Sequence, residues 1–121
     1  MGGYQIMDYH IYVGLLLMMA LDIATGYAGA IVAGNVSSTK MRNGLFHKLG
    51  FICAIVLAAL IENMCTYLDL GFQLTVLQPA VAAYIVLTEV SSILENIVIL
   101  NPSLGDNTFL AIFKNRSDDN E

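Results

Sequence analysis

Three long runs of apolar residues dominate this chain, and short polar segments separate them. The runs cover residues 11–33, 46–68 and 74–100, and a more polar tail follows over residues 101–121. A helix needs about 20 residues to cross roughly 30 Å of hydrocarbon, so each run is long enough to span a bilayer. The pattern therefore predicts an all-α integral membrane protein with three transmembrane helices, in a single membrane domain over residues 1–121.

The polar segments predict how the three spans connect. Residues 34–44 carry turn residues at both ends and charge between them, which is typical of an exposed loop. Residues 69–71 leave so little chain that the second and third spans are expected to form an antiparallel hairpin, with Pro79 in the opening turns of the third. The Asn101-Pro102 pair is expected to end that helix, because proline disfavours helical geometry in the preceding residue.

The tail after the third span is too short and too polar to cross. It mixes apolar and polar positions, and its apolar residues are Leu104, Phe109, Leu110, Ile112 and Phe113. This pattern fits a short amphipathic helix along the inner surface of the membrane. A loosely ordered tail is the alternative, which the sequence leaves open.

Positive charges predict the orientation. The five cations are Lys40, Arg42, Lys48, Lys114 and Arg116, and three crossings put all of them on one side. The positive-inside rule makes that side the cytoplasm, with the N-terminus outside and the C-terminus inside. The first run has no cation before it and a long apolar core, so we expect it to be a retained span and not a cleaved signal peptide.

Composition excludes several classes of protein. The chain is 57% hydrophobic and 12% charged, whereas soluble domains average about 25% charged residues. Its net charge of -5 and its few cations argue against binding to nucleic acid. Cys53 and Cys65 are twelve residues apart in one apolar run, too far along a helix to bridge each other within a chain, and are interpreted as small buried apolar residues.

Acidic residues within the spans are the most informative feature. They are Asp22, Glu62, Glu89 and Glu95. No Lys or Arg lies within residues 11–33 or 49–100, so we expect no ion pair within the spans of one chain. Because each acid near the bilayer centre costs about 2.5–3.5 kcal/mol, protonation, hydrogen bonds or water must lower that cost. We therefore expect these groups at a helical interface, most simply in an oligomer.

Helical spacing divides the candidate residues into two kinds of surface. On the third span, polar and small residues recur every three or four positions, with Glu95 beside the lower end of the stripe: Gln78, Ala82, Ile85, Glu89, Ser92 and Asn96. We expect this stripe to meet protein or water in an assembly, and its burial inside a three-helix monomer is the alternative. The other two spans carry small residues at steps of four, which permit close helix packing in lipid. These are Gly26, Ala30 and Gly34 after Asp22, and Gly50, Ala54 and Ala58 before Glu62.

Enzymatic chemistry has no support in the sequence. His10 and His47 are isolated, no Cys or His has the spacing of a metal site, and the phosphate-loop and nucleophile motifs are missing. Glu89 and Glu95 are six residues apart, about 9 Å along a helix, with no soluble cleft to hold a substrate. We expect no enzyme, no cofactor and no metal.

Two stretches resemble a known family. Residues 15–50, LLLMMALDIATGYAGAIVAGNVSSTKMRNGLFHKLG, contain an Asp-x-x-Thr-Gly, a Ser-containing loop and a Gly-x-x-x-Lys. Residues 88–104, TEVSSILENIVILNPSL, contain a Glu-x-x-Ser-Ile-x-Glu-Asn and a following Pro. Together they resemble the phage holin family that also includes clostridial toxin-secretion holins. The matching positions are Asp22, Thr25, Gly26, Ser38, Gly44 and Lys48, followed by Glu89, Ser92, Ile93, Glu95, Asn96 and Pro102.

The resemblance implies a holin that oligomerises in the bacterial inner membrane. Such proteins form lesions that release an endolysin for host lysis, and related members export large toxins. The residues expected at a pore or oligomer interface are Asp22, Gly26, Gln78, Glu89, Ser92, Glu95 and Asn96. Those expected in helix packing are Ala30, Gly34, Gly50, Ala54, Ala58 and Glu62. A small proton- or cation-coupled transporter or channel is the alternative function, and an accessory membrane subunit without a pore is a third.

Overall fold

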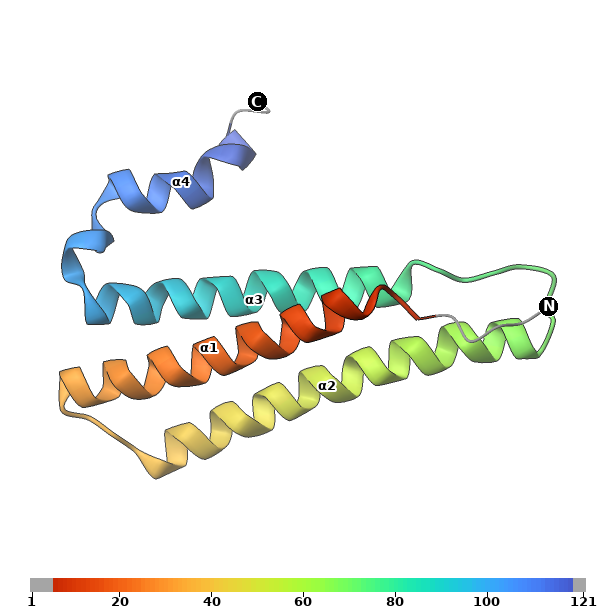
Figure 1. Ribbon diagram of the computed structural model, residues 1–121, viewed down its shortest axis with the longest axis horizontal. Helices are drawn as coiled ribbons and strands as arrows, with labels where there is room; N and C mark the ends of the chain where they lie inside the picture. Colours follow the sequence, from red (N-terminus) through yellow and green to blue (C-terminus); the bar gives the residue numbers. More distant parts are fainter. Residues whose placement is uncertain (1–5, 119–121) are drawn as a thin grey trace.

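The fold is a bundle of three long helices with a short helical tail. The computed structural model describes residues 6–118, except for the side chains at 107 and 114–118. The elements are α1 (Tyr9–Ala33), α2 (Ser38–Tyr67), α3 (Leu77–Leu100), the 3₁₀ turn η1 (Pro102–Gly105) and α4 (Asn107–Asp118) (Figure 1). The three long helices are apolar and long enough to cross a membrane. This confirms the predicted all-α class with three candidate spans, while the orientation of the termini stays a prediction.

The second helix begins earlier than the hydrophobic pattern indicated. Ser37 is its N-cap, with extended backbone and a side-chain oxygen that accepts a hydrogen bond from the Lys40 amide at 3.3 Å. This cap satisfies an amide that the first turn would otherwise leave unpaired, so polar residues join the helix ahead of the apolar run. Gly34 ends α1 in the left-handed conformation, φ 71°, which suits glycine. The connection is therefore a few residues long, and the predicted loop over 34–44 is wrong in its second half.

The connection between α2 and α3 is longer than expected. α3 begins at Leu77 instead of residue 74, and Asp69 and Gly71 both have positive φ, 54° and 83°, in the turn that follows α2. Pro79 lies in the first turn of α3, where its missing N–H leaves no helical bond unmade. The two helices run antiparallel, as the hairpin prediction required (Figure 1).

The tail forms a helix, as one of the two expectations required, while its position along the inner surface of the membrane stays a prediction. Asp106 precedes α4 and its carboxylate accepts hydrogen bonds from the amides of Thr108 at 2.9 Å and Phe109 at 3.2 Å. The rings of Phe109 and Phe113 meet edge-on at 5.3 Å. Within the described residues α4 packs against η1 and stands clear of the long helices (Figure 1).

Most large apolar side chains face outward, as lipid requires. The buried apolar core is small and lies where the three helices meet, at Leu15, Met19, Phe51, Ile55, Ala82 and Ile85. Leu17 and Leu87 are 64% and 68% exposed, which in water would be unfavourable but in hydrocarbon is neutral. Cys53 is exposed and Cys65 half-buried, and both are free thiols. The predicted burial is thus wrong for Cys53, which faces away from the other helices, and holds only in part for Cys65.

Candidate functional site

A charged cluster joins the three helices near their middle. Lys48 of α2 places its Nζ 2.5 Å from Asp22 Oδ2 of α1 and 2.9 Å from Glu89 Oε2 of α3. The side chains are almost fully buried, at 9%, 11% and 1% exposure in that order. Asp22 and Glu89 lie close to the midpoints of their helices. The cluster thus sits at the expected depth of the bilayer centre, and it carries one positive and two negative groups.

Neutral donors complete the shell around Asp22. Ser92 Oγ donates to Asp22 Oδ1 at 2.7 Å, and Asn96 Nδ2 donates to the same oxygen at 2.9 Å. Asn96 Nδ2 also lies 3.1 Å from Thr25 Oγ1. Asp22 therefore takes part in contacts with both neighbouring helices. Such hydrogen bonds are strong in a medium of low dielectric constant and offset part of the cost of removing the carboxylate from water.

The expectation that no ion pair lies within the spans is wrong. It counted Lys48 with the polar loop, because the apolar run begins beside it. With α2 starting at Ser38, Lys48 is ten residues inside the helix, roughly 15 Å along its axis. Its long side chain then reaches α1 and α3. The signal that sequence reasoning missed was Ser37, since a helix cap ahead of the polar residues moves Lys48 to membrane depth.

The structure buries the predicted stripe of α3 inside the single chain. Gln78, Ala82, Ile85 and Glu89 are buried, and Ser92 and Asn96 are half-buried. This arrangement corresponds to the alternative interpretation of the stripe, burial in a three-helix monomer. Asp22, Glu89, Ser92 and Asn96 meet in the charged cluster, whereas Gln78 lies several turns away along α3.

A second polar group lies towards the other end of the bundle. Glu62 Oε1 of α2 accepts a hydrogen bond from the Gln78 amide at 2.9 Å, and the Tyr12 hydroxyl of α1 bonds to Gln78 Oε1. Glu62 therefore caps the start of α3, where an amide would otherwise be unpaired. Asn63 Nδ2 beside it donates to the Ala59 carbonyl at 2.7 Å. Glu62 is one of the residues expected in helix packing, and no pattern in the sequence indicates its partners.

Glycines allow α1 to approach α3 closely. A Cβ on Gly26 would lie 3.5 Å from Asn96 Nδ2, and one on Gly29 would lie 3.3 Å from Ile99 Cγ2. The remaining small residues do not share one role. Ala58 is buried, Ala54 and Ala30 are half-buried, Gly50 has open space where a Cβ would point, and Gly34 ends its helix. The close approach of α1 brings Asn96 within reach of Asp22.

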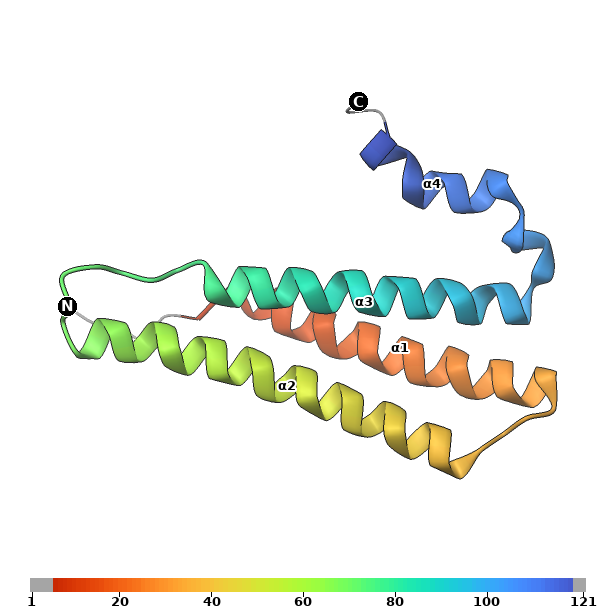
Figure 2. The same cartoon turned by 180° about the vertical axis from the view of Figure 1, so that it is seen from behind.

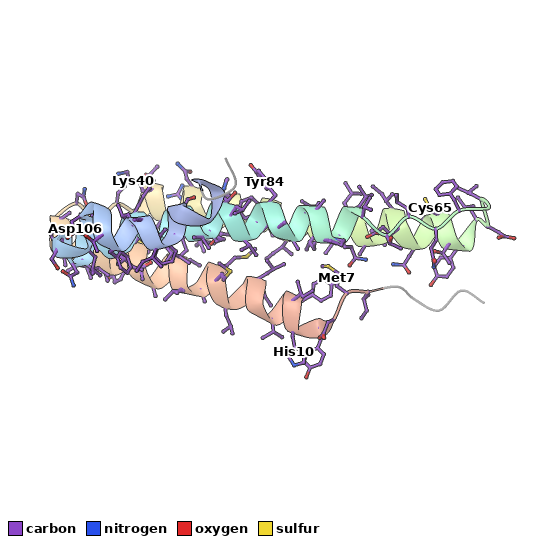
Figure 3. The ribbon with its side chains drawn as sticks, turned by 90° about the horizontal axis from the view of Figure 1, so that it is seen from above. Met7, His10, Lys40, Cys65, Tyr84 and Asp106 are labelled. Carbon is purple, nitrogen blue, oxygen red and sulfur yellow. The ribbon has the colours of Figure 1, made fainter. Side chains whose placement is uncertain are left out.

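Glu95 lies apart from the charged cluster, on an exposed face of α3. Six residues from Glu89 correspond to about 120° around the helix, so the two acids point in different directions. Glu95 shares its face with Tyr84, Thr88 and Ser91, at steps of four, three and four residues. We call these four residues the outer stripe. Tyr84 is 64% exposed (Figure 3) and its ring meets Phe51 of α2 edge-on at 6.1 Å.

The hydroxyls of Thr88 and Ser91 in the outer stripe make hydrogen bonds within α3, but the acid does not. Thr88 Oγ1 donates to the Tyr84 carbonyl at 2.9 Å, and Ser91 Oγ donates to the Leu87 carbonyl at 3.0 Å. Within the part of the chain that the structure describes, the Glu95 carboxylate has no hydrogen-bond or ion-pair partner. An isolated protomer would thus expose the Glu95 carboxylate and the side chains of Tyr84 and Ser91 to lipid, with Thr88 half-buried between them.

The histidines lie outside the charged cluster. His10 Nδ1 is 2.6 Å from Asp8 Oδ1 at the start of α1, and His47 meets the Phe51 ring edge-on at 4.5 Å. Among the described residues, no group of three or more His, Cys, Asp or Glu side chains is placed to hold a metal ion.

Comparison with known protein families gives a match over most of the chain. Residues 4–107 match the sequence model of a family described as the bacteriophage holin family. That range includes the charged cluster, the second polar group around Glu62, and all three long helices. No curated protein and no solved structure matches the chain.

Proposed function

This chain belongs to the bacteriophage holin family, and from that premise we propose that its copies assemble in the bacterial inner membrane into lesions that release proteins. The passenger is an endolysin, which then reaches the cell wall, or a large exported toxin. Support comes from the family match together with three helices that are apolar and long enough to cross a membrane.

The observation that carries the assembly is the Glu95 carboxylate, which lies on the exposed face of α3 and has no partner among the described residues. An acid in hydrocarbon costs about 2.5–3.5 kcal/mol at the centre of a helix and less near the interface, and this cost is removed when the group finds water or a donor. A neighbouring copy that covers the outer stripe can supply a donor. A lumen lined by the outer stripe supplies water. Self-association therefore relieves the least favourable feature of the protomer surface.

The charged cluster has a different part in this proposal. Asp22, Lys48 and Glu89 already satisfy one another within the chain, so they need no second copy. They hold α1, α2 and α3 together as a unit, and assembly then proceeds through the outer stripe. This assigns Glu95 to contact between copies, and Asp22 and Glu89 to the integrity of each copy.

A small proton- or cation-coupled transporter is the second candidate. Its support is the position of Asp22 and Glu89 near the middle of their helices, where ion-coupled proteins keep their carboxylates. The two functions differ in what they let through. A transporter passes ions without releasing a folded enzyme, whereas a holin passes proteins.

Co-expression with an endolysin in bacteria tests the proposal. We expect the unaltered chain to release the endolysin and lyse the cells at a reproducible time, and Glu95→Leu to delay or abolish lysis at equal membrane abundance. Asp69→Asn is the matched control, because it removes a carboxylate from the α2–α3 connection and asparagine tolerates the positive φ there. Normal lysis timing in Glu95→Leu would refute the role of the outer stripe. Ion leakage without protein release by the unaltered chain would favour the transporter.

A further inference from the structure

A lateral cleft separates α1 from the first part of α2. It has a volume of about 320 Å³ and is closed at the back by α3, at Ser92, Asn96 and Ile99. The loop that joins the two helices forms one end, and Asp22 with Lys48 forms the other. Figures 1 and 2 show the cause: α2 runs away from α1 towards their connecting loop. The volume lies at the low end of the range for small-molecule sites.

The length of the cleft matches one leaflet of a bilayer. Its α1 wall runs from Ala33 to Asp22, eleven residues or roughly 16 Å of helix axis. Half of a hydrocarbon core is about 15 Å thick. The cleft therefore extends from the level of the headgroups to near the midplane, where the charged cluster closes it.

The middle of the cleft is suited to an alkyl chain. Its walls are Ile23, Tyr27 and Ala30 on α1 and Met41 and Leu45 on α2. An ordered water molecule needs two to four polar partners, and these side chains offer few. Since the cleft opens sideways between two spans, the surrounding solvent at this depth is lipid.

The mouth of the cleft is suited to an anionic headgroup. Lys40, Asn35 and Ser37 line it, and Lys40 lies at the loop end of the bundle (Figure 3). Between Asp22 and Glu62 the chain carries three cations and no acidic residue, so the positive charge here has no local acid on its own segment. Asp106 lies at the same end of the bundle (Figure 3), but it caps α4 and does not line the cleft.

We propose that this cleft binds one anionic phospholipid of the adjacent leaflet. Its phosphate lies against Lys40 and the polar groups at the mouth, and one acyl chain extends between α1 and α2 towards the charged cluster. The lipid fills the space between the two helices and thereby supports the side of Lys48 that α3 does not cover. This inference stands independently of the proposed lytic function, because it concerns the single chain.

Lipid retention by the purified full-length chain tests the proposal. Phosphatidylglycerol and phosphatidylcholine with the same acyl chains are added in detergent, and the bound lipid per protomer is counted by native mass spectrometry. We expect phosphatidylglycerol to be retained about fivefold more, the factor for about 1 kcal/mol per cation near an anionic surface. Glycerol phosphate, the free headgroup analogue, should neither bind nor stabilise comparably.

Two matched pairs of variants localise the site. Lys40→Gln should abolish the preference for phosphatidylglycerol, whereas Arg42→Gln, which removes a charge two residues away and off the cleft, should keep it. Gly44→Leu should prevent retention of both lipids by filling the cleft. Gly50→Leu is its control, since both glycines have open space at Cβ but Gly44 alone lines the cleft.

Any one of four results would overturn the assignment. Equal retention of the two lipids would exclude a headgroup site, and equal stabilisation by glycerol phosphate would exclude a role for the acyl chain. If Gly44→Leu instead dissociates an oligomer while leaving lipid retention unchanged, a helix of a second copy occupies the cleft. Unchanged retention in Gly44→Leu, with no change of assembly, would also refute the site.

Discussion

Lys48 Nζ lies 2.5 Å from Asp22 Oδ2, which joins the second helix to the first at a depth where neither charge is stable alone. The same nitrogen lies 2.9 Å from Glu89 Oε2, so one cation links all three long helices. A single protomer can therefore hold two acids in hydrocarbon without help from another copy. The two polar surfaces therefore differ in role: the charged cluster stabilises the protomer, and the outer stripe remains available for contacts with other copies.

Replacing the cation should harm the fold more than replacing either acid. Lys48→Met leaves two carboxylates buried without a counter-ion, and loss of one partner from a buried ion pair typically costs about 3–5 kcal/mol. Glu89→Gln leaves Lys48 with Asp22, and the amide oxygen can still accept a hydrogen bond. Unfolding in mixed detergent micelles, followed by circular dichroism, measures both effects.

The control for this prediction is a charge-free cluster. Lys48→Met combined with Asp22→Asn and Glu89→Gln removes all three charges and should recover most of the stability that Lys48→Met loses. Equal stability of Lys48→Met and the unaltered chain would show that the buried pairs do not hold the bundle together.

Close packing of α1 on α3 should depend on Gly29. A Cβ at this position would lie 3.3 Å from Ile99 Cγ2 and 3.9 Å from the Asn96 carbonyl oxygen, so the larger side chain of Gly29→Leu has no room. Overpacking of this kind costs about 1–3 kcal/mol. Gly14→Leu is the matched control, because a Cβ there meets nothing within 4 Å. The same detergent unfolding assay should show a loss for the first variant and none for the second.

The three spans were predictable because a helix that crosses lipid needs a long uninterrupted apolar run, and each of the three runs forms most of one helix, α1, α2 or α3. The start of α2 was not predictable in this way, since hydrophobicity alone assigns residues 34–44 to a loop and ignores the cap at Ser37. That error also displaced Lys48 from the membrane. A helix boundary shifted by eight residues thus concealed the counter-ion of Asp22 and Glu89.

The rotation of α3 about its own axis was equally beyond the sequence. Polar residues occupy two faces of this helix, one through Glu89 and one through Glu95, so polarity does not indicate which face turns inward. Packing decides which face turns inward. Asn96 and Ile99 of α3 pack against Gly26 and Gly29 of α1. This contact orients Glu89 towards the other helices and leaves Glu95 on the outside.

The first turn of α1 should be sensitive to acid. Asp8 caps the helix, and the hydrogen bond from the His10 amide at 2.9 Å, together with the His10 side chain, lowers the pKa of the Asp8 carboxyl below its ordinary 3.8. A lowered pKa in the folded state means that the stabilisation is present above pH 3.8 and is lost as the pH falls through the lower folded value. The protection factors of the His10 and Ile11 amides, which compare their exchange rates with those of an unstructured peptide at the same pH, should therefore fall below pH 3.8.

A variant separates this effect from general acid unfolding. Asp8→Asn keeps a side-chain oxygen that can cap the helix but does not titrate in this range. The protection factors of its first-turn amides should not change in this way with pH. If both proteins show the same loss of protection, the titration of Asp8 is not the cause.

Contacts between copies should form at the outer stripe. With Cys53 and Cys65 replaced by alanine, Ser91→Cys introduces one thiol at the exposed centre of this stripe. In the proposed assembly neighbouring copies cover this face, so mild oxidation of membranes should give several times more disulfide-linked dimer than it gives for Leu17→Cys. Leu17 is a suitable control, since it is 64% exposed on α1 with apolar surroundings. Adding Glu95→Leu to Ser91→Cys should reduce the dimer to the level of the control, as measured by electrophoresis without reductant. Equal cross-linking at both positions would mean that copies meet through random collisions and not through the outer stripe.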